Sequence, residues 1–457
     1  MKDLDFDDFF RRATAIQTGP FDYQRRLACG EKVDNRHEWL QSSAPCDSRI
    51  ISVPTGCGKT AAAVLTWLWN RVEKQRSDWP RRLVYCLPMR TLVEQTHDNV
   101  CEWLKNLGDL EWNGEADHSG KIGVHILMGG EEKTDWDLYP EHDAILIGTQ
   151  DMLLSRALNR GYGMSRYRWP MHFGLLNNDC LWVLDETQLM GVGVETSAQL
   201  DGFRHEGEIG AQPTCRTWWM SATLDEAQLT TIDHPKPEAG WPVIQLGEDD
   251  LALPAVQDRY NAKKNISRWA LALDSADKAE YARSLANFIV ERHQLAPHTL
   301  TLVVVNNVRR AQDVYQQLQR SRAVECIALI HSRFRPPDRK RPEEILFAGG
   351  GRIVVATQAV EAGVDVSAGA LITELAPWSS LVQRFGRCNR YGEFAAGSEI
   401  FWIDIKPRDE KDELALPYSL DELKIARDLL ERLGDDAGPR SLREKNDYQP
   451  PLEIRPV

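Results

Sequence analysis

A short glycine-rich sequence in the first part of the chain has the residue types and spacing for phosphate chemistry. Gly56, Gly58, Lys59 and Thr60 follow a β-branched run and precede a helix-forming run. In that setting, backbone N–H groups close around phosphate, a lysine neutralises its charge and a threonine hydroxyl binds Mg²⁺. The usual first glycine of this pattern is replaced by Val53. We predict an ATP site with Mg²⁺, and its loop residues are Thr55, Gly56, Cys57, Gly58, Lys59 and Thr60.

Two adjacent carboxylates close another apolar run. Asp185 and Glu186 follow residues 181–184, so they should emerge at the carboxyl edge of a sheet, where the phosphate loop also lies. Asp185 can hold Mg²⁺ through water, and Glu186 can act as the general base on an attacking water. An acidic pair at a strand end is often an ordinary surface turn. Together with the phosphate loop, however, it indicates hydrolysis of a nucleoside triphosphate.

An arginine-rich sequence supplies the third part of the predicted site. Arg384, Arg387 and Arg390 are spaced three apart, so they should share a helix face, and planar guanidinium groups suit a phosphoryl group that gains charge during transfer. A helix face making salt bridges is the alternative for an isolated pair. We expect Arg387 and Arg390 to be arginine fingers from a second domain, with Gln383 beside them. ATP would then close a cleft between the domains.

The elements that must position these residues follow an α/β pattern. Short apolar runs, each followed by a polar turn and a helix-like segment, predict parallel sheets covered by helices. Expected strands in the first half are 49–53, 83–87, 144–148, 181–184 and 217–220, and in the second half 300–305, 326–330, 352–356, 371–373 and 399–403. We predict two similar domains, 1–240 and 241–405. Residues 406–457 would add one helix, capped by Ser419 and Glu422 and stopped by Gly434, and a proline-rich tail.

Composition narrows the class of protein. The 457 residues carry a net charge of −13, which speaks against a protein that coats nucleic acid through a broadly basic surface. The acidic amino terminus does not resemble a secretory signal, and no apolar run approaches the roughly 20 residues of a membrane span. The nine cysteines include no Cys-x-x-Cys pair, which argues against a zinc site or disulfide framework. We expect a cytoplasmic protein with a local nucleic-acid path.

With these residues in view, the chain resembles a superfamily 2 helicase of the DEAD/DEAH-box kind, with motifs in order from about Gly19 to Asp404. The resemblance implies two tandem RecA-like domains. It also implies that Gln24 reads adenine, with Phe21 or Tyr23 beside the base. Further implied nucleotide residues are Gly363 and Asp365, and the implied coupling residues are Gln188, Ser221 and Thr223. The implied contacts to the nucleic-acid backbone are Pro88, Arg90, Thr91, Gln95, Thr149, Gln150, Asn306, His331, Ser332, Arg333 and Thr357.

Within that superfamily, three sequences resemble the signature helicase of type I CRISPR–Cas antiviral systems. They are Asp185-Glu-Thr-Gln-Leu-Met-Gly191, His331-Ser-Arg-Phe334 and Pro377-Trp-Ser-Ser-Leu-Val-Gln-Arg-Phe-Gly-Arg-Cys-Asn-Arg390. General DEAD-box RNA helicases carry Asp-Glu-Ala-Asp instead. The resemblance implies ATP- and Mg²⁺-dependent 3′-to-5′ translocation along single-stranded DNA, after recruitment to an R-loop opened by an RNA-guided surveillance complex. Such a motor should hold the backbone rather than read bases.

Members of that family usually also carry an HD-type metal-dependent nuclease. His97-Asp98 and His142-Asp143 are the His-Asp pairs of this chain, and neither is joined by spaced histidines that resemble a dinuclear metal site. We therefore expect the nuclease on a separate polypeptide or after Val457, as in subtype I-U, where the motor comes first.

Two other functions stay open from the sequence. An RNA helicase or a restriction-type DNA translocase would share the same motor. A nucleotide-binding scaffold without activity would need a lesion at a catalytic position. The chain retains the expected catalytic residues Lys59, Asp185, Glu186, Gln383, Arg387 and Arg390.

Overall fold

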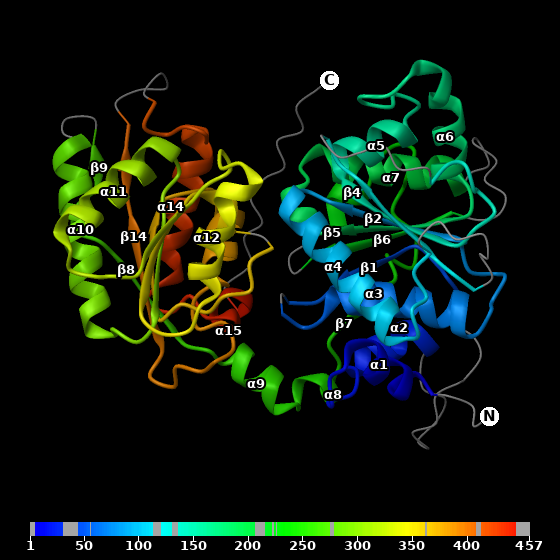
Figure 1. Ribbon diagram of the computed structural model, residues 1–457, viewed down its shortest axis with the longest axis horizontal. Helices are drawn as coiled ribbons and strands as arrows, with labels where there is room; N and C mark the ends of the chain where they lie inside the picture. The colour runs from blue at the N-terminus through cyan, green and yellow to red at the C-terminus, as the bar shows by residue number, and fades with distance from the viewer. Residues whose placement is uncertain are drawn as a thin grey trace. The chain divides into compact units, whose positions relative to one another are not determined.

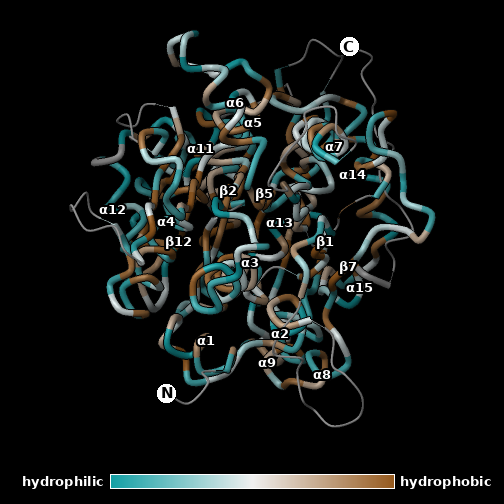
Figure 2. The backbone as a smooth tube through the Cα atoms, turned by 90° about the vertical axis from the view of Figure 1, so that its right-hand side faces the viewer, coloured by the Kyte–Doolittle hydropathy of each residue, from teal (hydrophilic) through white to brown (hydrophobic). Residues whose placement is uncertain are grey.

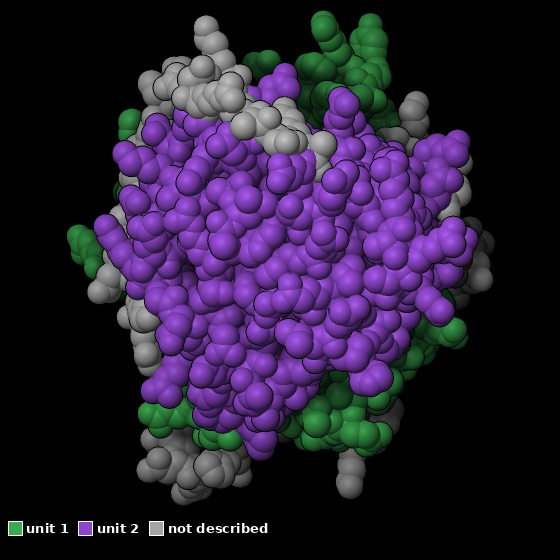
Figure 3. All heavy atoms as spheres, turned by 90° about the vertical axis from the view of Figure 1, so that its left-hand side faces the viewer, with its two compact units in different colours: residues 1–252 green, residues 253–457 purple. Residues whose placement is uncertain are grey.

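The computed structural model divides into two compact units, Met1–Ala252 (unit 1) and Leu253–Val457 (unit 2), which Figure 3 colours separately. It describes residues 5–30, 44–54, 56–112, 120–129, 136–205, 215–221, 224, 226–274, 278–361, 363–407 and 413–444. None of the helices within these ranges is long and apolar enough to cross a membrane.

Unit 1 is built on a parallel seven-stranded sheet with the order β3-β4-β2-β5-β6-β1-β7. The strands are β1 (Arg49–Ser52), β2 (Arg82–Leu87), β3 (Gly123–Leu127), β4 (Ala144–Thr149), β5 (Cys180–Asp185), β6 (Arg216–Ser221) and β7 (Val243–Gln245). Parallel strands need crossover connections, and helices supply most of them. Because all strands run the same way, the segments that follow their carboxyl ends gather at one edge of the sheet.

Helices cover both faces of this sheet (Figure 1). One face carries α1 (Phe6–Thr14), α2 (Asp22–Cys29), α3 (Lys59–Trp67), which continues as a π-helical turn over Leu68–Glu73, and α4 (Arg90–Asn106). The other carries α5 (Gln150–Ala157), α6 (Trp169–Asn177) and α7 (Val192–His205). The short α8 (Glu248–Leu251) ends the unit, and 3₁₀ turns span Arg166–Arg168, Thr187–Leu189 and Glu226–Leu229.

Successive residues of each strand enter opposite cores. On β2, Leu83 and Tyr85 pack in the cluster of α1 to α4, whereas Val84 and Cys86 pack in the cluster of α5 to α7. A sheet buried on both faces needs near-continuous apolar strands rather than alternating ones. The central strands are accordingly brown in Figure 2.

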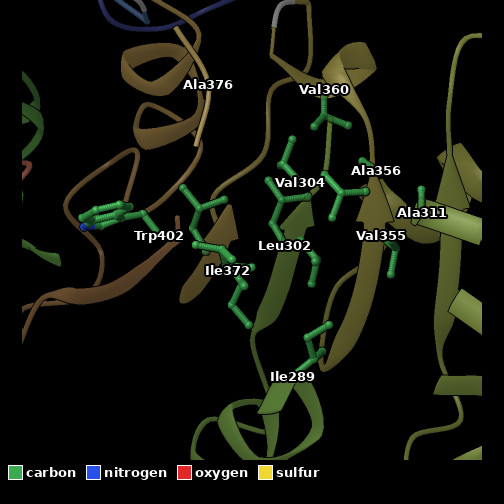
Figure 4. Packing of buried hydrophobic residues seen from close by; sticks show 14 of the residues in the cluster. Ile289, Leu302, Val304, Ala311, Val355, Ala356, Val360, Ile372, Ala376 and Trp402 are labelled. Carbon is green, nitrogen blue, oxygen red and sulfur yellow. The ribbon is translucent and has the colours of Figure 1, made fainter. Parts of the chain in front are cut away.

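Unit 2 holds a parallel six-stranded sheet with the order β11-β12-β10-β13-β14-β8, and a small pair β15-β9. Its strands are β8 (Lys264–Arg268), β9 (Leu273–Asp274), β10 (Leu300–Val304), β11 (Ile327–Ile330), β12 (Arg352–Ala356), β13 (Ala370–Glu374), β14 (Ser398–Ile403) and β15 (Ile405–Lys406). Its helices are α9 (Pro254–Tyr260), α10 (Lys278–Leu295), α11 (Val308–Ser321), α12 (Pro336–Phe347), α13 (Trp378–Phe385), α14 (Leu420–Leu433) and α15 (Pro439–Glu444), with a 3₁₀ turn at Gln358–Val360. One apolar cluster fills the unit, with Leu302 and Ile372 at its centre in Figure 4.

The predicted fold class, two parallel-sheet α/β domains, is confirmed. The capping box of Ser419 and Glu422 at the start of α14 is also confirmed, as is the end of this helix at Gly434. The sequence predicts that residues 406–457 lie apart from the second domain. The structure instead places α14 in the core of unit 2, since Leu423 and Leu430 belong to the same apolar cluster as the sheet.

Candidate functional site

The phosphate loop connects the carboxyl end of β1 to the first turn of α3, which begins at Lys59. Gly56 and Gly58 adopt φ angles of 86° and 71°, in the left-handed region that favours glycine. A Cβ atom on Gly58 would also lie 2.8 Å from Gln24 Nε2. The loop therefore ends at the start of a helix, where the backbone N–H groups of the first turn are suited to an anion. Thr55 lies outside the described residues.

The Lys59 ammonium is buried and incompletely paired. Its Nζ lies 3.4 Å from Glu186 Oε1, and the two side chains are only 5% and 12% exposed. Within the described ranges, Nζ finds no hydrogen-bond partner. A buried ammonium without hydrogen bonds is costly, and the oxygens of a phosphate group would supply them. The orphaned Nζ beside the glycine loop fits a phosphate ligand.

Asp185 is buried at the end of β5 and held by two donors. The Glu186 N–H donates to Oδ1 at 2.9 Å, and the Tyr85 hydroxyl donates to Oδ2 at 2.8 Å. Burial, together with the neighbouring Glu186 carboxylate, raises the pKa of Asp185 to about 6. A divalent cation would favour the charged form. The Thr60 side chain lies close enough to the Tyr85 hydroxyl to lower its pKa. The two predicted Mg²⁺ ligands, Thr60 and Asp185, therefore both lie near this hydroxyl, and their oxygens fit the metal.

A hydrogen-bonded chain joins the predicted general base to the end of β6. Gln188 Nε2 donates to Glu186 Oε2 at 2.5 Å, and Ser221 Oγ donates to Gln188 Oε1 at 2.7 Å. Glu186 itself has a φ of 56°, a left-handed conformation that is strained for a non-glycine residue and is often found at functional sites. Glu186, Gln188 and Ser221 therefore form one connected group. Thr223 lies outside the described residues.

Gln24 is almost fully buried between its own helix and the phosphate loop. Its Oε1 accepts from the Phe21 N–H at 2.9 Å, and its Nε2 donates to the Gly58 carbonyl at 2.9 Å. The Tyr23 hydroxyl donates to the Cys57 carbonyl at 2.6 Å, and the Tyr23 ring stacks on Phe21. The adenine contact of Gln24 stays a prediction, but this residue does connect α2 to the loop.

The predicted nucleic-acid residues of unit 1 lie in the segments that follow the carboxyl ends of β2 and β4, at the same edge of the sheet as the phosphate loop. Thr149 ends β4, and Gln150 begins α5. Pro88 follows β2, and the first turns of α4 carry Arg90, Thr91 and Gln95. Arg90 and Gln95 are exposed. Their contacts with nucleic acid stay predictions.

The expectation of a shared helix face for the arginines of unit 2 is wrong. Helix α13 ends at Phe385, with Gly386 as its C-cap, so Arg387 and Arg390 lie beyond it. Arg387 is buried and donates to the Val360 and Glu361 carbonyls at 3.2 and 2.7 Å. Arg390 pairs with Asp365, with 2.7 Å between Nε and Oδ1. Both arginines are therefore held inside unit 2.

Arg384, within α13, is the fully buried centre of a polar network. It bonds Glu361 Oε1 at 2.8 Å, Thr373 Oγ1 at 2.8 Å and Asn306 Oδ1 at 3.0 Å. The side chain of Asn306, a predicted nucleic-acid residue, is therefore buried and hydrogen-bonded inside unit 2. Tyr418 also contacts Arg384, at 3.4 Å. Sequence reasoning did not identify Tyr418, because no motif surrounds it.

The other predicted residues of unit 2 are distributed between interior and surface. His331 is buried and stacks on Phe334 with ring centroids 4.2 Å apart, and burial lowers its pKa. Ser332 and Arg333 are exposed. Buried positions are occupied by Thr357 and Gln383, and Gly363 has a φ of 73°.

Replacing Arg384 with alanine should destabilise unit 2 by about 3–5 kcal/mol, because it leaves the buried Glu361 carboxylate without its partner. The free energy of unfolding in urea measures this effect. The exposed Arg309, changed to alanine, is the matched control and should alter stability by less than about 0.5 kcal/mol. Equal stability of the two variants would show that the network is not a structural centre.

The two His-Asp pairs lie apart from this site. His97 is on α4, 3.3 Å from Asp98, and the His142 ring stacks on Tyr139. In the part of the chain that the structure describes, no group of three or more His, Cys, Asp or Glu side chains could hold a metal ion.

Comparisons with known proteins give two family models. The model described as DEAD/DEAH box helicase matches residues 39–232, and the model described as CRISPR-associated nuclease/helicase Cas3, C-terminal, matches residues 298–393. The first range contains the phosphate loop and the acidic pair. The second contains the arginine-rich sequence up to Arg390.

Similar curated proteins share these names. The CRISPR-associated helicase Cas3 of Thermoproteus tenax is 28% identical over 76% of this chain and 54% of its own length. The CRISPR-associated nuclease/helicase Cas3 of Haloferax volcanii is 35% identical over 85% of this chain and 50% of its own length. The chain thus spans about half the length of these relatives.

Solved structures share the fold. The T. fusca Cas3 structure with AMPPNP superposes with a TM-score of 0.67 at 18% identity, covering 96% of this chain and 52% of that one. S. cerevisiae Dbp5 bound to RNA and ADP BeF3 gives 0.55 at 15% identity, covering 94% and 91%. At these identities the likeness establishes the fold alone.

Proposed function

We propose that the chain is an ATP-driven motor on nucleic acid, because residues 39–232 match the DEAD/DEAH box helicase model and the chain is similar to Cas3 proteins over most of its length. The observation that carries this proposal is the orphaned Lys59 ammonium between the glycine loop and Glu186. That arrangement has a place for a phosphate group and a carboxylate beside it to accept a proton.

The residues of unit 1 divide the ATPase chemistry among them. Lys59 neutralises the β- and γ-phosphates, and Glu186 accepts the proton of the attacking water. Thr60 and Asp185 would hold Mg²⁺, which supplies positive charge to the phosphoryl oxygens when bound. Ser221 senses the state of Glu186 through Gln188.

Unit 2 contributes arginines in this proposal. For Arg387 and Arg390 to act as fingers on the transferred phosphoryl group, Arg387 must give up the carbonyls of Val360 and Glu361, and Arg390 must leave Asp365. These exchanges would make hydrolysis depend on a rearrangement in unit 2. They offer a link from nucleotide state to movement along a strand.

The substrate we propose is single-stranded DNA. The motor would translocate along it from 3′ to 5′, after an RNA-guided surveillance complex of a type I CRISPR system has opened an R-loop. Support comes from the names of the relatives and from the acidic pair Asp185-Glu186, which continues as Thr-Gln rather than Ala-Asp. The HD nuclease would act on the same DNA from a separate polypeptide or a further part of a longer chain.

ATP hydrolysis by the purified chain with single-stranded DNA, with single-stranded RNA and without nucleic acid tests this proposal. We expect DNA to stimulate turnover about tenfold or more, and removal of Mg²⁺ with a chelator to abolish it. Strand displacement on DNA with a 3′ overhang, but not a 5′ overhang, should follow. Stimulation by RNA alone would contradict the DNA assignment, and an absence of turnover would favour a scaffold.

Replacing Ser221 with alanine should separate hydrolysis from movement. The change removes the 2.7 Å hydrogen bond to Gln188 while leaving Lys59, Asp185 and Glu186 in place. DNA-stimulated ATPase activity should stay within about threefold of wild type, whereas DNA strand displacement should fall about tenfold, as expected for loss of a coupling interaction. The exposed Ser165, changed to alanine, is the control. A parallel loss of both activities would mean that Ser221 serves hydrolysis itself.

A further inference from the structure

A buried carboxylate outside every helicase motif holds the amino-terminal end of α2. Asp250 lies on α8, with no measurable exposure, and its two oxygens accept three backbone N–H groups. Oδ1 accepts from Asp22 at 2.5 Å, and Oδ2 accepts from Tyr23 at 3.1 Å and from Gly247 at 3.0 Å. The first two bonds join residues that are more than 220 positions apart in sequence.

Helix α2 depends on this carboxylate. Phe21, its N-cap residue, makes no side-chain hydrogen bond to the free N–H groups of the first turn. Helix starts normally take such a bond from a neighbouring Ser, Thr, Asp or Asn, and a negative charge there also interacts favourably with the helix dipole. Asp250, near the carboxyl-terminal end of unit 1, supplies both the hydrogen bonds and the negative charge.

The other side of α2 carries the contacts to the phosphate loop. Tyr23 donates to the Cys57 carbonyl, and Gln24 donates to the Gly58 carbonyl. Arg26 fastens the helix a second time to the terminal segment of unit 1, since its Nη2 donates to the Gln245 carbonyl at 2.5 Å. Helix α2 therefore bridges two parts of the chain, the nucleotide loop and residues 245–250.

We infer that Asp250 is a positioning residue for the nucleotide site, which sets α2 so that Gln24 and the Phe21–Tyr23 pair meet the adenine base. The inference rests on the proposed ATPase function. Asp250 is followed by the boundary between Ala252 and Leu253. The short helix α8 therefore leads into unit 2 and, through Asp250, also holds the start of α2, which we propose recognises the base. ATP binding and the conformation of residues 245–251 should influence each other by equal amounts.

Asp250→Asn is the test variant, because an amide keeps the size of the side chain but directs an N–H donor at backbone N–H groups. We expect the KM for ATP to rise about fivefold to tenfold and kcat to stay within about twofold, since Lys59 and Glu186 are untouched. The ratio of KM for GTP to KM for ATP should fall, because only base recognition is loosened. Glu248→Gln, an exposed neighbour on the same helix, is the matched control and should match wild type.

Amide hydrogen exchange of residues 245–251 gives a second measurement. In the wild-type chain, AMPPNP should slow exchange in this segment, and in the Asp250→Asn variant the slowing should be lost. A residue with a purely structural role would lower the melting temperature but leave the GTP-to-ATP ratio and the nucleotide-dependent exchange unchanged. That result would overturn the inference.

A variant that retains one attachment keeps the test valid if Asp250→Asn does not fold. Arg26→Gln removes the contact with the Gln245 carbonyl and the ion pair with Asp22 inside α2, but it leaves the three bonds of Asp250 in place. It should lower the ratio of KM for GTP to KM for ATP in the same direction by a smaller factor. An unchanged ratio in this folded variant would overturn the inference. If the wild-type chain binds ATP and both variants behave as wild type, only the inference about Asp250 is overturned. If the wild-type chain itself binds no ATP, the proposed ATPase function is overturned as well.

Discussion

Replacing Lys59 with alanine is expected to abolish nucleotide binding and all DNA-stimulated ATPase activity. The ammonium lies 3.4 Å from Glu186 Oε1, is buried, and has no hydrogen-bond partner among the described residues. Two phosphate groups held in that place would lose their main neutralising charge. We expect ATP affinity to fall at least about a hundredfold, as for removal of a charged partner in a buried site. Equilibrium binding of a fluorescent ATP analogue measures the loss.

The same variant should leave the free protein as stable as wild type. Removal of an ammonium that is buried without hydrogen bonds relieves a desolvation cost, which offsets the lost ion pair with Glu186. The Glu186 carboxylate also keeps its hydrogen bond from Gln188. Wild-type protein should melt at a higher temperature when ATP and Mg²⁺ are added, by mass action, and the variant should not. Lys105→Ala, at an exposed position of α4, is the control. Retained turnover in the Lys59 variant would refute the phosphate-loop assignment.

Glu186→Gln is expected to bind ATP normally and to hydrolyse it about 10² to 10⁴ times more slowly. The substitution removes only the group that accepts a proton from water, and general bases contribute rate factors of that size. The amide oxygen can still accept the hydrogen bond from Gln188, so the link to Ser221 should survive. Single-turnover hydrolysis and ATP binding, measured on the same preparation, separate the chemical step from affinity.

The slow hydrolysis of this variant should also lengthen its binding to single-stranded DNA. Because this variant stays in the ATP-bound state, it should hold single-stranded DNA longer than wild type does when ATP is present. The Glu102→Gln change, at an exposed position in the second half of α4, is the control and should behave as wild type. If the Glu186 variant failed to bind ATP, Glu186 would be a structural partner of Lys59 rather than the base.

Most of the sheet framework could be predicted because both faces of each sheet are buried. Strands such as β2 and β10 are then continuous apolar runs that stand out in the sequence. The phosphate loop was predictable for a different reason. Its glycines, Lys59 and Thr60 are neighbours in sequence, so one local pattern contains the whole feature.

The parts that could not be predicted depend on contacts between distant residues. Asp250 caps a helix that begins at Asp22, and no local spacing relates them. Tyr85 looked like one more apolar strand residue, although a hydroxyl in the middle of a buried run was a signal that it needs a partner. The prediction of one helix that carries Arg384, Arg387 and Arg390 was wrong because α13 ends at Phe385. Gly386 directly follows its last turn, and glycine is the common residue at helix ends.

The buried network around Arg384 has a consequence for how this part of the chain varies in evolution. Arg384 draws its partners from four other segments, at Asn306, Glu361, Thr373 and Tyr418, and its guanidinium donates a hydrogen bond to each of them. A change at one position leaves its partners unsatisfied, so single replacements should be removed by selection, while compensated pairs survive. Among relatives of this chain, positions 384 and 361 should therefore covary, charge with charge or apolar with apolar. Tyr418 should vary with them, although it lies outside every helicase motif.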